Sequence, residues 1–168
     1  MSKLLALDQA SHITGWAIFE DDQLKEWGKF SVDDEDIGDR LYKIRNFVKE
    51  TIETKNIDKL VFEDIQLQTN VQNNVKTFKI LAEVFGVIYE LATEMKIPNQ
   101  AILSGTWKST LGIKGKNRQE QKRNAKAWAQ DTYGIKCTQD EADAICIGSH
   151  IIKKGFTGEE DSDSYSWD

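Results

Sequence analysis

Residues 4–19 read LLALDQASHITGWAIF, and this stretch guides how the rest of the sequence is interpreted. Four apolar residues lead directly to the carboxylate of Asp8, and a short polar segment then leads into a second apolar run that ends at Phe19. Two apolar runs separated by a polar turn are typical of adjacent β-strands. A charge directly after a buried run has no local structural purpose, and burying it unpaired is costly. Asp8 is therefore the first candidate functional residue.

Apolar runs and helical periodicities continue along the chain from this stretch. They predict strands at residues 3–7, 13–19, 24–32, 59–64 and 99–105, an amphipathic helix over 41–52, a long helix over 75–95, a helix over 117–133 and a last helix from about 138. Pro98 ends the long helix because proline lacks the backbone N–H that a helix interior needs. The predicted order is βββαβαβαα, without repeats or a linker. It indicates an α/β domain, with helices packed on a mixed sheet.

Composition limits the class of protein. The chain has 168 residues, of which 39% are hydrophobic and 30% charged, as in an ordinary soluble domain. No stretch reaches the roughly 18 to 20 consecutive apolar residues that span a membrane, and the first residues show no secretory pattern. We expect a cytoplasmic protein. Cys137 and Cys146 are expected to be reduced core residues.

The charge is unevenly distributed. Residues 156–168 contain five acidic residues and no basic one, so we expect them to form a disordered acidic tail after a nearly neutral domain over residues 1–155. Residues 104–136, in contrast, contain eight basic residues and two acidic ones. A basic patch on a nearly neutral body suits phosphate binding. A solvated helix face explains the same segment equally well when it is considered alone.

Four carboxylates stand at the ends of predicted elements, namely Asp8, Glu63, Asp140 and Asp143. Asp140 and Asp143 share a face of the last helix because they are three residues apart. Glu63 and its neighbour Asp64 point to opposite sides of their strand, so only one of them can join Asp8. If the first and fourth strands are neighbours, the carboxylates cluster, and a divalent cation relieves their repulsion. Oxygen-only ligands favour Mg²⁺ or Mn²⁺, whereas a capping role is the usual alternative for Asp140 alone.

Three motifs resemble those of RuvC-type Holliday junction resolvases, in the order and at the spacing of that family. They are LALDQASHITGWAIF (5–19), LVFEDIQLQ (60–68) and QDEADAICIGSH (139–150), and the resemblance covers about residues 3–152. It implies a ribonuclease H-like fold, with a five-stranded mixed sheet and helices on both faces. It also implies a homodimer that nicks two opposed strands of a four-way DNA junction, leaving 5′-phosphate and 3′-hydroxyl ends.

The resemblance also implies roles for individual residues. Asp8, Glu63, Asp140 and Asp143 match the catalytic metal ligands, with Mg²⁺ as the cofactor and Mn²⁺ as a substitute. The segment WKSTLGIKGKNRQEQK (107–122) is similar to the family's DNA-binding segment. The compact size, the Asn/Gln-rich loop and the acidic tail resemble phage members, and a phage-encoded member would act in the host cytoplasm. The candidate DNA contacts are Lys108, Lys114, Lys116, Arg118, Lys122 and Gln66.

The sequence departs from the family at two places. Gln9 and Ala10 stand where the family usually has Pro-Gly, so the backbone must turn differently there. The loop over residues 65–68 has no aromatic residue to stack on bases, so we expect a looser enzyme that also accepts forks and other branched DNA. The alternatives are a ribonuclease H-like nuclease for forks or RNA:DNA hybrids and a junction-binding protein without activity. An actin-like kinase needs a second domain and glycine-rich phosphate loops, and the sequence has neither.

Several single residues leave alternatives open. The helix over 75–95 has more apolar positions than one buried face needs, so it forms either a dimer interface or an ordinary core helix. Trp107 stacks on bases or packs in the core, and Trp128 is expected in the core. His12 and His150 are interpreted as partly solvated surface histidines rather than groups near the metal.

Overall fold

The structure is a computed structural model that describes residues 2–66 and 74–158. Its strands are β1 (Lys3–Asp8), β2 (Ile13–Glu20), β3 (Gln23–Ser31), β4 (Lys59–Glu63) and β5 (Asn99–Ile102). Its helices are α1 (Ile37–Lys55), α2 (Asn74–Glu94), α3 (Ser104–Leu111), α4 (Arg118–Tyr133) and α5 (Gln139–Lys154).

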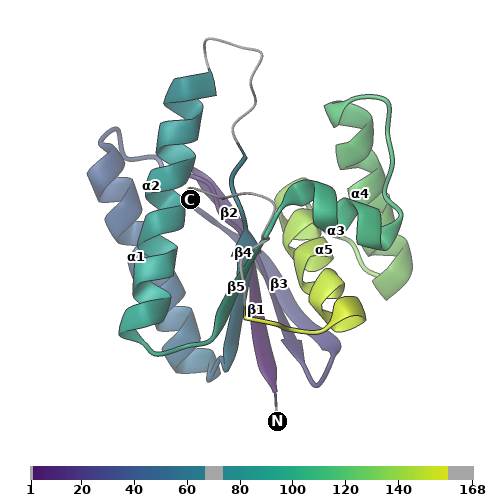
Figure 1. Ribbon diagram of the computed structural model, residues 1–168, viewed down its shortest axis with the longest axis horizontal. Helices are drawn as coiled ribbons and strands as arrows, with labels where there is room; N and C mark the ends of the chain where they lie inside the picture. Colours follow the sequence, from purple (N-terminus) through teal and green to yellow (C-terminus); the bar gives the residue numbers. More distant parts are fainter. Residues whose placement is uncertain (1, 67–73, 159–168) are drawn as a thin grey trace, which may run out of the picture.

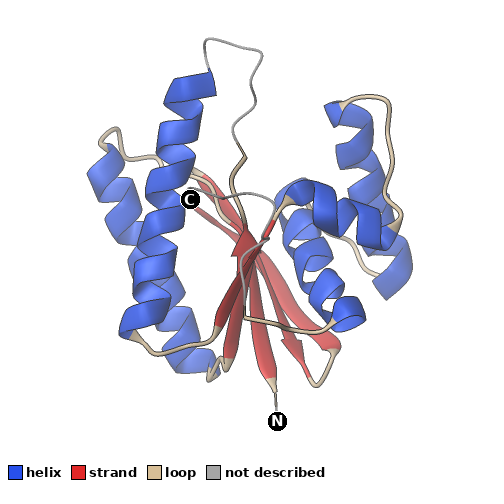
Figure 2. Ribbon diagram, viewed as in Figure 1, coloured by secondary structure: helices blue, strands red, loops and turns tan. Residues whose placement is uncertain are grey.

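The strands form one mixed sheet in the order β3-β2-β1-β4-β5 (Figure 2). The two hairpins make β1, β2 and β3 antiparallel, whereas β1, β4 and β5 run parallel. The predicted pairing of the first and fourth strands is therefore confirmed. Leu7 pairs with Phe62, so the next residues, Asp8 and Glu63, lie at the same edge of the sheet.

Helices cover both faces of the sheet, with α1 and α2 on one side and α3, α4 and α5 on the other (Figure 1). β1 is buried on both faces, which explains its continuous apolar run. Its alternating side chains place Leu5 and Leu7 in the core against α1 and α2, and Leu4 and Ala6 in the core against α5. Asp8 follows Leu4 and Ala6 in this alternation, so its side chain faces α5.

Helix α5 lies directly against β2 because two glycines leave room for it. A Cβ atom on Gly15 of β2 would lie 1.9 Å from the carbonyl oxygen of Asp140, and one on Gly148 of α5 would lie 2.1 Å from the ring of Phe19. Thr138 and Glu141 form a capping box that fixes the first turn of α5. The start of α5 is therefore held over the centre of the sheet.

The sequence did not predict helix α3. Residues 104 and 105 were assigned to the fifth strand, which instead ends at Ile102, and the following residues were left without an element. The helix has eight residues, and Trp107 is the one that it buries, so it has no apolar period to detect. Gly112, in the left-handed conformation at φ 71°, ends it.

Three further predictions concern the tail, the two cysteines and the absence of a membrane span. Phe156 packs against the core, and the amides of Thr157 and Gly158 donate to Gln100, so residues 156–158 still contact the body. The rest of the predicted tail, 159–168, lies outside the described residues. Both cysteines are free thiols; Cys146 is buried in the core, as predicted, whereas Cys137 is only partly buried. Within residues 2–66 and 74–158, no helix combines the length and apolarity needed to cross a membrane.

Candidate active site

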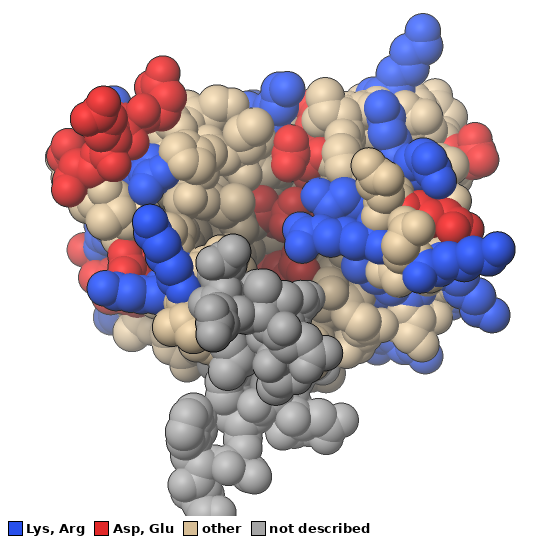
Figure 3. Space-filling model, turned by 90° about the horizontal axis from the view of Figure 1, so that it is seen from above, with Lys and Arg blue, Asp and Glu red and all other residues tan. Residues whose placement is uncertain are grey.

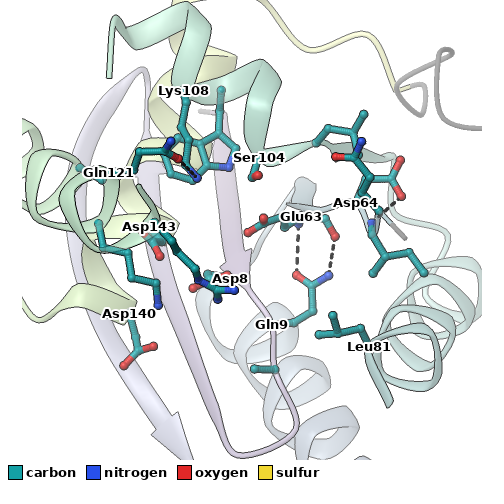
Figure 4. Close-up of a pocket in the computed structure, with 18 residues that line it drawn as sticks. Asp8, Gln9, Glu63, Asp64, Leu81, Ser104, Lys108, Gln121, Asp140 and Asp143 are labelled. Carbon is teal, nitrogen blue, oxygen red and sulfur yellow. Dashed lines mark hydrogen bonds between the residues drawn. The ribbon is translucent and has the colours of Figure 1, made fainter. Parts of the chain in front are cut away.

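A pocket of about 530 Å³ opens where β1 and β4 end. All four predicted carboxylates line it (Figure 4), together with residues of α3 and α4. Figure 3 shows acidic atoms inside a hollow on this face of the molecule, with Lys and Arg side chains gathered along one side of it. The pocket therefore has an acidic interior beside a basic wall.

Strand alternation brings Asp8 and Glu63 together. Val61 packs in the core on the α5 side, so Glu63, two residues later, faces that side as Asp8 does. Asp64 is buried as well, but its carboxylate accepts a hydrogen bond from the amide of Ile65 at 2.8 Å. It lies apart from the other acidic side chains in Figure 4. Asp64 also lines the pocket, but Glu63 is the residue of this pair that shares the sheet face of Asp8.

The end of β4 is held by Gln9, a residue whose role the sequence did not reveal. The backbone amide of Glu63 donates to Oε1 of Gln9 at 3.1 Å, and Nε2 of Gln9 donates to the carbonyl of Glu63. Gln9 is buried, with 6% of its surface exposed. Both hydrogen bonds are drawn in Figure 4.

Helix α5 supplies the other two carboxylates. Asp140 and Asp143 are one turn apart near its start and both line the pocket, as the spacing predicted. Oδ1 of Asp143 accepts a hydrogen bond from Nε2 of Gln139 at 3.2 Å. The contact of Asp140 with Gly15 places this turn beside Asp8, because Asp8 pairs with Gly15 in the sheet.

The carboxyl groups are perturbed by burial and by one another. Burial is the main cause that raises the pKa of Asp8 well above its usual range, and the charges of Glu63 and Asp143 add to it. Burial also raises the pKa of Glu63 to about 7 and that of Asp143 to about 6. The two groups interact directly, so the pKa values of Asp8 and Glu63 depend on each other. Strongly perturbed pKa values of this kind cluster at functional sites.

The donor set fits a hard divalent cation in its chemistry. Four carboxylates supply only oxygen ligands, which Mg²⁺ and Mn²⁺ prefer over softer donors. The raised pKa values of Asp8, Glu63 and Asp143 are those expected where positive charge is needed. Among the described residues, however, no three His, Cys, Asp or Glu side chains are grouped closely enough to hold an ion as they lie. The role of the four residues as ligands stays a prediction.

Three of the predicted basic contacts line the pocket, namely Lys108 of α3 and Arg118 and Lys122 of α4. Lys108 donates to Gln121 at 3.2 Å and lies 5.3 Å from the ring of Trp107. Gln66 also lines the pocket. Lys114 and Lys116 are exposed on the segment between α3 and α4 and lie outside the pocket lining. Residues 67 and 68 of the predicted loop are outside the described part of the chain.

The aromatic and histidine predictions had mixed outcomes. Trp107 is 2% exposed, so stacking on a base is wrong for it, whereas Trp128 packs against the core as predicted. His12 hydrogen bonds with Arg40 and lies outside the pocket lining. His150 is buried against Thr110 at 2.9 Å, so its assignment to the surface is wrong.

The pocket also contains polar residues that the sequence did not single out. Ser104 and Gln121 line it together with Gln9. Gln121 links the basic wall to the preceding loop, since it accepts from Lys108 and donates to the carbonyl of Gly115 at 3.2 Å. Glutamines in a charged segment carry no sequence signal of this kind. The sequence offered a hint only for Gln9, because Gln9 and Ala10 stand where the resembled family usually has Pro-Gly.

Comparison with solved structures defines the fold class. RuvC of T. thermophilus in complex with a Holliday junction substrate matches with a TM-score of 0.70 at 15% identity, covering 89% of this chain and 92% of that chain. T. thermophilus RuvC in another structure matches with a TM-score of 0.64 at 16% identity, covering 88% and 92% of the two chains. The yeast mitochondrial Holliday junction resolvase Ydc2 matches with a TM-score of 0.54 at 14% identity, covering 90% and 78%.

These similarities establish a ribonuclease H-like fold of the RuvC type, as the motifs predicted. The five-stranded mixed sheet with helices on both faces is likewise confirmed. No family model matches the sequence, and no curated protein is significantly similar to it. At 14 to 16% identity, the solved structures define the fold of the chain.

Proposed function

We propose that this protein is a metal-dependent DNA endonuclease that resolves four-way junctions by paired nicks. The observation that carries the proposal is the pocket itself, where carboxylates from β1, β4 and α5 lie beside cations from α3 and α4. A phosphodiester needs both groups: cations to hold the phosphate, and carboxylates to hold the metal that activates water. The RuvC-type fold supports the same conclusion.

Asp8, Glu63, Asp140 and Asp143 would hold Mg²⁺, with Mn²⁺ as a substitute. When bound, such ions supply an activated water and stabilise charge on the scissile phosphate. Lys108, Arg118 and Lys122 would orient the phosphate and stabilise the charge that develops on it. Because they lie along one side of the pocket, we expect the DNA backbone to enter from that side. The products would carry 5′-phosphate and 3′-hydroxyl ends.

Branched DNA is the substrate that the fold supports best. The structure of T. thermophilus RuvC that matches this chain contains a Holliday junction substrate. Gln66, exposed at the edge of the pocket, provides a hydrogen-bonding side chain rather than a stacking ring. We therefore expect activity on forks as well as on four-way junctions, with little sequence preference.

A homodimer would provide the two active sites that paired nicks require. Helix α2 has apolar residues at coiled-coil spacing, from Val75 through Phe78, Ala82 and Phe85 to Tyr89. Val75 and Tyr89 are 69% and 43% exposed, although both are large and apolar. An α2–α2 contact would bury this stripe. Sedimentation at micromolar concentration should give a dimer, and a Tyr89→Lys variant should be shifted towards monomer.

Cleavage of labelled DNA tests the proposed activity. A four-way junction, a fork, a linear duplex and an RNA:DNA hybrid are each incubated with Mg²⁺ or with EDTA. Asp8→Asn is the inactive variant, and Asp22→Asn, in the exposed β2–β3 turn, is the matched control. Paired Mg²⁺-dependent nicks in opposed junction strands, lost in Asp8→Asn and kept in Asp22→Asn, are expected.

Other outcomes would contradict the proposal in different ways. Tight junction binding without a nick in Mg²⁺ or Mn²⁺ would indicate an architectural DNA-binding protein. Cleavage confined to the hybrid would indicate a ribonuclease. A monomer that nevertheless makes paired nicks would leave the nuclease in place and remove the α2 interface.

A further inference from the structure

At the end of β4, a side chain rather than the backbone of the neighbouring strand makes the hydrogen bonds between β4 and β1. Backbone groups of alternate residues in a strand point to opposite neighbours. The amide of Asp64 donates to Ile102 of β5 at 2.8 Å, so the amide and carbonyl of Glu63 point towards β1. β1 has ended at Asp8, and the carboxamide of Gln9 takes both groups of Glu63 instead.

We propose that Gln9 is a positioning residue that fixes the carboxylate of Glu63 against that of Asp8. The inference rests on the proposed function, because it concerns the two strand carboxylates of the same site. Gln9 follows Asp8 in the chain and binds the backbone of Glu63 on both sides of its Cα. One side chain therefore connects the backbones that carry the two carboxylates.

The chemistry of this connection selects a glutamine. The backbone of Glu63 offers one donor and one acceptor, and a carboxamide is the side-chain group that offers the complementary acceptor and donor. Glutamate has no donor when ionised, methionine has neither group, and asparagine is one methylene shorter. The Pro-Gly turn of the resembled family has no side chain able to make these bonds. The pair of hydrogen bonds from Gln9 to the backbone of Glu63 therefore has no side-chain equivalent in a Pro-Gly turn.

The position of Gln9 separates this role from substrate binding. In Figure 4 its carboxamide lies beside the backbone of Glu63, on the opposite side of the acidic cluster from Lys108 and Gln121. Both polar ends of the carboxamide are occupied by Glu63. Loss of the restraint should therefore affect metal binding more than DNA binding. Substitution of a residue that orients a metal ligand without binding the metal typically lowers metal affinity about 10- to 100-fold.

The test compares Gln9→Met, which keeps the length of the side chain, with Gln130→Met. Gln130 makes the same kind of bond outside the pocket, since its Oε1 accepts from the amide of Cys137 at 3.2 Å. Mn²⁺ binding is measured by calorimetry without DNA, and junction affinity is measured in EDTA. Gln9→Met should weaken Mn²⁺ binding about 10- to 100-fold and should change the junction Kd less than about twofold. Gln130→Met should change neither quantity.

The outcomes separate this inference from the proposed function. If the wild-type protein binds Mn²⁺ and cuts junctions while Gln9→Met binds Mn²⁺ equally well, the role of Gln9 is wrong and the nuclease stands. If the wild-type protein neither binds Mn²⁺ nor cuts, the proposed function itself fails. A purely structural role predicts a lower Tm with unchanged Mn²⁺ affinity in the folded protein, and would also overturn the inference. Should Gln9→Met not fold, Gln9→Asn replaces it, with a weaker Mn²⁺ affinity again expected and a wild-type affinity overturning the role.

Discussion

Replacing Gly15 with alanine should disable the site without touching a charged residue. The new Cβ would lie 1.9 Å from the carbonyl oxygen of Asp140 and 2.5 Å from its carbonyl carbon. Ordinary non-bonded contacts begin near 3.4 Å, so the two backbones must separate by about 1.5 Å. β2 is paired on both sides, with Asp8 and Lys29 opposite Gly15. The first turn of α5 is therefore the part that moves.

That movement exceeds what the chemistry tolerates. Metal–ligand distances allow deviations of about 0.2 Å, and a misplacement of about 1 Å in a catalytic group costs about 100-fold in rate. Asp140 and Asp143 move together because they share the first turns of α5. We expect Gly15→Ala to cut Mg²⁺-dependent junction cleavage at least about 100-fold. The strain should lower the free energy of unfolding by about 1–3 kcal/mol.

The assay measures single-turnover cleavage and urea unfolding on the same preparations. Gly105→Ala is the matched control, because a Cβ on this exposed glycine of α3 meets no atom within 4 Å. It should keep the wild-type rate and should gain about 0.5–1 kcal/mol of stability, since alanine favours a helix over glycine. A folded Gly15→Ala protein that cleaves at the wild-type rate would refute the proposed placement of α5 over the site.

Three further predictions concern protonation, the basic wall and the cap of α5. The pKa values of Glu63 (about 7) and Asp143 (about 6) are raised, so the folded state binds protons at these groups more tightly than the unfolded chain does. These two groups should therefore make the protein in EDTA more stable at pH 5 than at pH 8. Urea unfolding should show a difference of at most about 3 kcal/mol for each group, and cleavage at limiting Mg²⁺ should rise between these pH values. Greater stability at pH 8 would contradict the raised pKa values. Lys108→Ala should lower the single-turnover rate about 100- to 1,000-fold and weaken junction binding much less, whereas equal losses in both would indicate a binding role alone. Thr138→Ala, which removes the cap of α5, should lower the free energy of unfolding in urea by about 1 kcal/mol. It should also lower cleavage more than the control Tyr133→Phe, which removes the 2.6 Å hydrogen bond to Ser149 at a similar cost in stability. Equal cleavage by the two variants would show that the cap has no influence on the site.

Much of the fold could be predicted because its signals are local. The apolar runs of β1 and β4 are continuous because both strands are buried on both faces. The carboxylates follow from the same signals, since Asp8 and Glu63 end those strands and Asp140 and Asp143 share a helix face. Helix α3 was missed because it is short and buries Trp107 alone, which leaves no period to detect.

The details of the pocket depend on tertiary contacts that a sequence does not display. Gln9 acquires its role because β1 ends one residue before it while β4 continues to Glu63. The contact of Gly15 with Asp140 depends on how closely α5 approaches β2. His150 was misassigned because Thr110, its partner, belongs to the unpredicted helix. Each of these features joins residues that are distant in the chain.

The electrostatics of the pocket explain why its parts belong together. A phosphate entering beside Asp8, Glu63 and Asp143 would meet like charges in a partly buried setting, where their repulsion is strong. Burial, with a further contribution from neighbouring carboxylates, raises the pKa values of Asp8, Glu63 and Asp143, so bound protons offset part of that charge as the pH falls. A divalent cation would replace such protons and attract the phosphate. Under the proposed function, Lys108 and its neighbours would then hold the DNA backbone without opposing the acidic interior. Metal and DNA should therefore strengthen each other's binding, because each neutralises charge that the other alone would leave unbalanced.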